Sequence, residues 1–328
     1  MTPKELAEIW RALPDNTDAN DFPHRAEMIY NKDLLPRYIE ACYYAAALSD
    51  STERAATFMV EQAHGLRRLE TREGLESAAK LLATAQANIY NIDDKVRAKR
   101  LIELVLYHGI WGVHFPLGNF GKCADLCENS VTYATDKLSQ ARAGYHHLLF
   151  LLWEAIVIQA SNHELEELAI EVNVAGQHLI DVAKGTDAEY HETANVLCHE
   201  LTLVSINPDI SLGGSELYSY EETAKLQSWI LNGKISLDGF GATVAALSAK
   251  AHIELGDDIA GKEFLKHIHG YVEAEAFAKL ISLQLSANKN AEDLRPQLDD
   301  LLDFNDQVGG HLYRGIARLE FSRLLSAK

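Results

Sequence analysis

The sequence predicts an all-α protein, and three observations support this prediction. The 328-residue chain contains only seven prolines, and few of its 20 glycines lie outside the breaks between apolar segments. Alanine, leucine, glutamate and lysine, which have high helix propensity, are abundant. No stretch shows the strict alternation of apolar and polar residues that is typical of a half-buried strand. We therefore expect helices connected by short turns.

The most informative segment runs from Tyr107 to Ser130 and predicts two helices joined by a tight turn. Gly118 is placed to end the first helix, because glycine readily adopts the left-handed conformation found at helix C-termini. Asn119 is placed to open the second helix. Small and medium-sized side chains then recur at helical spacing, which allows a neighbouring helix to pack closely: Phe120, Cys123, Cys127 and Ser130.

This unit resembles the tetratricopeptide repeat, a pair of antiparallel helices in about 34 residues. With Gly118 as the glycine of the family's turn, Trp111 occupies the small-residue position of the first helix. Cys123 then takes the alanine position of the second helix and Cys127 its aromatic position. These three residues depart from the family consensus. The resemblance implies antiparallel helical hairpins stacked as a right-handed solenoid, with the first helices lining a concave groove.

Further hairpins are predicted along the chain. The clearest copy spans 242–268, with Ala249 before a turn at Gly256. Less regular copies are predicted for 53–69 with 74–87, 145–159 with 163–182, 193–204 with the segment after Gly214, and 274–285 with 291–302. The turns near residues 118, 160, 205 and 256 are about 42, 45 and 51 residues apart, longer than the family's usual period.

We expect a single domain over 1–328, with a divergent helical part at 1–52, hairpins over 53–306 and a capping helix at 307–328. The segment Thr2-Pro3-Lys4-Glu5 predicts a helix start with a capping box. The N-terminus has no apolar signal region, which predicts a cytoplasmic protein. The most apolar run, Leu148–Ile158, is too short to span a bilayer, so we expect no membrane segment.

Charge and cysteine content narrow the classes of partner and compartment. The chain has 30 Lys and Arg against 48 Asp and Glu, a formal net charge of -18. This disfavours nucleic-acid binding, which needs a basic surface, and favours a basic protein or peptide partner. The four cysteines form no C-x-x-C pair and are expected to be reduced core residues. The sequence does not predict the oligomeric state.

Histidine is unusually frequent, with 14 copies, which raises the question of a metal site. Glu61 and His64 have the Glu-x-x-His spacing of helical metalloproteins. Asp21 and His24 share that spacing but lie in a proline-containing loop, so no second helical pair is present. We therefore predict no metal, no cofactor and no catalytic residue. The alternative is an all-helical enzyme with a buried metal or small-molecule site around Glu61, His64 and the mid-chain histidines.

The resemblance implies a groove that binds an extended peptide or a helix of another protein. Taking the turns above as the register, the groove positions are His108, Phe115, His147, Glu154, Asn195, His199 and Lys250. We predict a non-catalytic protein- or peptide-binding scaffold or regulatory protein, whose histidines make binding sensitive to pH near 6.5. A further alternative is a sensor that binds a peptide or small molecule and changes its curvature.

Overall fold

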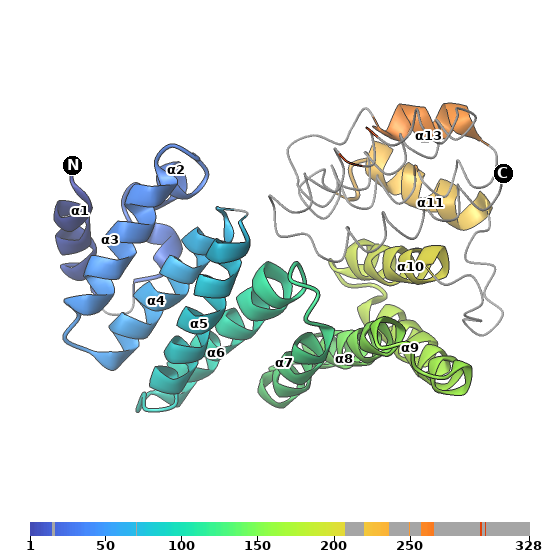
Figure 1. Ribbon diagram of the computed structural model, residues 1–328, viewed down its shortest axis with the longest axis horizontal. Coiled ribbons are helices and arrows are strands. Elements are labelled where there is room, and N and C mark those ends of the chain that lie inside the picture. Colours follow the sequence, from blue (N-terminus) through green and yellow to red (C-terminus); the bar gives the residue numbers. More distant parts are fainter. Residues whose placement is uncertain are drawn as a thin grey trace. The chain divides into compact units, whose positions relative to one another are not determined.

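The computed structural model describes residues 1–14, 17–69, 71–206, 220–235, 249, 257–265, 296 and 299. All regular structure in these residues is helical, which confirms the predicted all-α class (Figure 1). The chain divides into two compact units, 1–135 and 136–328. The right-handed solenoid and the single domain over 1–328 stay predictions. None of the described helices combines the length and the apolar character needed to cross a membrane.

In its described residues, unit 1 contains seven α-helices and two short turns of other helix types. In chain order they are α1 (Pro3–Arg11), η1 (Ala19–Asp21), α2 (Arg25–Ile29), α3 (Leu35–Ala47), α4 (Thr52–Arg67), α5 (Arg72–Ile89), α6 (Lys95–Gly109), the π-helical turn η2 (Ile110–His114) and α7 (Phe120–Tyr133). The predicted capping box of α1 is confirmed. The Thr2 hydroxyl accepts from the Glu5 amide at 3.3 Å, and the Glu5 carboxylate accepts from the Thr2 amide at 2.7 Å.

An aromatic cluster joins the divergent N-terminal part to α4. The Trp10 ring lies 5.6 Å from Phe22, 5.8 Å from Tyr38 and 6.4 Å from Phe58, measured between ring centroids. All four side chains are buried. The Trp10 indole also donates to the Pro23 carbonyl at 2.9 Å, so its one polar atom is satisfied. This packing makes residues 1–52 part of the same core as the first predicted hairpin.

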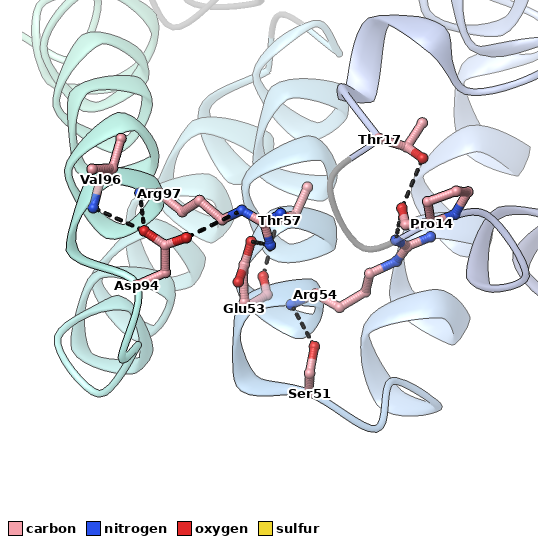
Figure 2. Close-up of polar contacts among 9 residues, drawn as sticks. All are labelled: Pro14, Thr17, Ser51, Glu53, Arg54, Thr57, Asp94, Val96 and Arg97. Atoms are coloured by element: carbon pink, nitrogen blue, oxygen red, sulfur yellow. Dashed lines mark hydrogen bonds and ion pairs between the residues drawn. The ribbon is translucent and has the colours of Figure 1, made fainter.

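Polar contacts at the start of α4 fix its neighbours in place (Figure 2). Arg54 donates to the backbone carbonyls of Trp10 and Pro14, at the end of α1. Arg97 donates to Glu53 at 3.0 Å and lies 3.5 Å from Asp94, which ties α4 to α6. The predicted pair 53–69 and 74–87 is thus α4 and α5, which pack against each other.

The turn at Gly118 is confirmed. Gly118 has φ +71°, which a residue with a side chain rarely adopts, and α7 begins two residues later at Phe120. Cys123 and Cys127 are reduced and buried, as predicted for core cysteines. The first helix differs from the prediction, because α6 changes into the π-helical turn η2 before the connection to α7.

Unit 2 contains α8 (Lys137–Val157), α9 (Asn162–Ala183), α10 (Glu189–Ile206), α11 (Tyr220–Leu231) and α13 (Asp258–Leu265). Helices α8 and α9 pack together and correspond to the predicted pair 145–159 and 163–182; α9 also packs against α10. The connection needs no glycine, because Gln159 adopts φ +57° and Ser161 forms a capping box with Glu164. Ala249 is helical and buried. Gly256, nearly all of the pair 274–302 and the capping helix at 307–328 lie outside the described residues.

Candidate functional site

Two of the predicted groove residues share a partly accessible stripe on α8. Gln140 is exposed, and the next residues on this side of the helix are half-buried: Gly144, His147, Leu151 and Glu154. Their spacing of four and three residues places them on one side of an α-helix. A Cβ added at Gly144 would meet no atom within 4 Å, so there is open space above this position. We call these five residues the α8 stripe.

The other groove residues lie in different surroundings. His108 is 7% exposed and Asn195 6% exposed, so neither side chain is open to a partner in this conformation. His199 is half-buried. Phe115 is half-buried, with its ring 5.5 Å from Trp111 and 6.1 Å from Phe120. Lys250 lies outside the described residues. Because His108 and Phe115 belong to unit 1 and the others to unit 2, a groove shared by all of them stays a prediction.

Unit 1 contains a buried ion pair at the position where the sequence suggested a metal ligand. Arg25 donates to the two carboxylate oxygens of Glu61, at 2.6 and 3.2 Å, and the Tyr38 hydroxyl donates to the same carboxylate. All three residues are buried. Such charge-assisted bonds offset the desolvation of the buried charges only when both partners are present. The ion pair therefore ties α2 and α3 to α4.

Two imidazole rings lie next to this ion pair. His64 of α4 and His108 of α6 lie against each other in a tilted arrangement, with a centroid distance of 4.8 Å and an angle of 30° between their planes. A guanidinium nitrogen of Arg25 is 3.5 Å from Nδ1 of His64. Burial, followed by the positive charge of Arg67, lowers the pKa of both rings, that of His108 to about 3. Both rings are therefore neutral at pH 7.

The side chains of Glu61 and His64, which the sequence suggested as metal ligands, thus contact other groups of the protein. Both oxygens of Glu61 accept hydrogen bonds from Arg25, and one also accepts from Tyr38. In the part of the chain that the structure describes, no group of three or more His, Cys, Asp or Glu is arranged to hold a metal ion. His24 is exposed and sits at the start of α2 with φ +65°.

Unit 2 contains a similar combination of an ion pair and histidine rings, in which Arg142 and His199 are half-buried. Arg142 of α8 donates to Glu192 of α10 at 2.8 Å, and Glu192 is fully buried. Asn195 lies 3.0 Å from Nε2 of His146, and the rings of His146 and His199 are 5.9 Å apart. Burial lowers the pKa of His146, and lowers that of His199 to about 4. The expectation that His108 and His199 titrate near pH 6.5 is therefore wrong for the folded chain.

Sequence reasoning singled out Glu61 as a possible metal ligand, but it missed the ion pairs of both units. Arg25 and Glu61 are 36 residues apart and Arg142 and Glu192 are 50 apart, so no local pattern links them. In α10 the sequence did contain a signal for the polar cluster, because Glu192, Asn195 and His199 are spaced so that they lie on one side of a helix.

No protein-family model, curated protein or solved structure matches the chain.

Proposed function

We propose that this protein is a non-catalytic scaffold or regulatory protein that binds a basic segment of another protein, and that the α8 stripe is part of its binding surface. The single observation that supports this proposal is the composition of the stripe. It combines an apolar residue, Leu151, with three polar residues, Gln140, His147 and Glu154, on one partly accessible side of a helix. Such a surface suits a segment with a few polar anchors and one apolar contact.

The basic character of the partner follows from charge. The chain carries a formal net charge of -18, and the stripe itself contributes the carboxylate of Glu154. Complementary charge increases association rates and disfavours acidic partners. Helix α8 is held in place by its packing against α9, so binding at the stripe costs little ordering of the protein.

The proposal includes a tetratricopeptide-like stacking of hairpins and a cytoplasmic location. The stacking is supported by two pairs of packed helices joined by short connections, α4 with α5 and α8 with α9.

Selection from a random peptide library tests this function. We expect selected peptides to carry lysine or arginine next to an apolar residue, and to bind at least about tenfold more weakly when Glu154→Lys is introduced. Glu166→Lys is the matched control, because it makes the same charge change at an exposed position of α9. Peptides that bind wild type and Glu154→Lys equally well would place the binding surface elsewhere.

A further inference from the structure

The adjacent rings of His64 and His108, which we call the histidine pair, form part of the contact between α4 and α6. His64 is 9% exposed and His108 is 7% exposed. Nδ1 of His108 is buried without a hydrogen-bond partner in the structure. A proton added to either ring would therefore create a buried charge with little solvation.

The groups that face the histidine pair carry mostly positive charge. Burial and these neighbours together keep both rings neutral. Arg25 is neutralised by Glu61, and this carboxylate is the single buried acid among the described neighbours of the pair. By element, the charged and titratable neighbours are Arg25 of α2, Tyr38 of α3, Glu61 and Arg67 of α4, Arg68 directly after α4, and Tyr107 of α6.

We propose that the histidine pair is an acid-sensitive contact, which holds α6 against α4 at neutral pH and opens more readily in mildly acidic solution. Protonating one ring places a cation beside Arg25 and Arg67, and protonating both places two cations side by side. Opening of the contact relieves this repulsion by exposing the rings to water. The inference concerns unit 1 and is independent of the α8 stripe.

The direction of the effect follows from proton linkage. An exposed histidine has a pKa of about 6.5, whereas the pKa of His108 in the folded chain is about 3. Below pH 6.5 the open state therefore binds more protons than the closed state, and the closed state loses stability as the pH falls. Between pH 7.5 and pH 5.0 each histidine should raise the opening equilibrium constant by about 30-fold, and the two together by up to about 1000-fold.

Hydrogen exchange of the full chain, measured by mass spectrometry, tests this proposal. The protection factor of α6 amides, calculated against the unfolded exchange rate at each pH, should fall by at least about 30-fold from pH 7.5 to pH 5.0. His108→Phe retains an aromatic ring but cannot be protonated. In this variant the ratio of the protection factors at pH 7.5 and pH 5.0 should be about 30-fold smaller than in wild type. His64→Gln provides a second variant that removes a titrating ring from the other helix.

His24→Asn is the matched control, because it removes an exposed histidine of the same unit and asparagine tolerates a positive φ. This variant should show the same fall in the α6 protection factor between pH 7.5 and pH 5.0 as wild type. An α6 protection factor in wild type that is the same at both pH values would overturn the proposal without any variant. An equal fall in wild type, His108→Phe and His64→Gln would also overturn it, since acid would then act on other groups.

Discussion

At the scale of single residues, the buried ion pair of Arg25 and Glu61 should contribute strongly to stability. Glu61→Gln leaves the guanidinium of Arg25 buried without its counter-charge, which typically costs about 3–5 kcal/mol. We expect this loss in urea unfolding followed by circular dichroism. Glu76→Gln is the control, because Glu76 pairs with Arg72 at 2.9 Å on the surface. Such exposed pairs contribute about 0–1 kcal/mol. Equal effects of the two substitutions would contradict this prediction.

Two glycines offer a second comparison at this scale. Gly118 has φ +71°, so Gly118→Val forces a branched side chain into a left-handed conformation and should lower the free energy of unfolding by about 1–2 kcal/mol or more. Gly144 is helical with no atom within 4 Å of an added Cβ, so Gly144→Ala should raise it by about 0.5–1 kcal/mol. Thermal unfolding of both variants provides the test. A stabilised Gly118→Val would refute the turn assignment.

The sequence predicted individual residues well where the cause was local. The capping box of Thr2 and Glu5 and the turn at Gly118 depend on neighbouring residues alone, and both are confirmed. The buried histidine of α8 was not predicted. The prediction placed His147 in the groove and gave no role to His146, whose buried ring belongs to the polar cluster of unit 2. One residue corresponds to a rotation of about 100° around a helix, so neighbouring histidines can differ fully in burial.

At the scale of elements, capping residues should control individual helices. Asp94 accepts from the amides of Val96 at 3.1 Å and Arg97 at 3.2 Å at the start of α6, as Figure 2 shows. Asp94→Ala removes this cap and a contact of the Arg97 side chain, so it should cost about 1–2 kcal/mol. Asp93→Ala changes an exposed neighbour that does not cap the helix and should have little effect. Hydrogen exchange of α6 would localise the loss, which should begin in its first turn.

The π-helical turn η2 is an element that the sequence did not predict. Helical periodicity predicted one helix up to Gly118, and it carries no information about a change of hydrogen-bond pattern within that helix. The turn packs against α5 and α7, and it also contacts α4. A Cβ added at Gly112 would lie 2.5 Å from Cδ of Arg67, so the glycine provides the room that the arginine occupies. Such a fit between two segments that are distant in sequence cannot be predicted from either segment alone.

At the scale of the whole molecule, both units combine an Arg–Glu ion pair with two neighbouring histidine rings. In unit 1 the ion pair joins α2 to α4, and in unit 2 it joins α8 to α10. These contacts connect helices that are distant in sequence, which is why composition predicted the helical class but not the polar clusters. The clusters also account for part of the high histidine content that the sequence left unexplained.

The last prediction concerns partner binding and separates recognition from stability. His147 is half-buried on the α8 stripe, whereas the His199 ring contacts His146 inside unit 2. Once a partner is identified, His147→Ala should lower its affinity with little change in melting temperature, because a partly accessible side chain contributes little to the core. His199→Ala should lower the melting temperature instead, since it removes a ring contact next to a buried histidine.

The two substitutions also differ in their effect on pH dependence. The pKa of His199 is about 4 in the folded chain, so this ring stays neutral from pH 7.5 down to about pH 5 and cannot change the affinity over that range. Any dependence of the affinity on pH between 5 and 7.5 should therefore persist in His199→Ala. Calorimetric titration of both variants at pH 7.5 and pH 5.5 measures this directly. A pH dependence that disappears in His199→Ala would show that binding itself exposes this ring, and would assign α10 to the recognition surface.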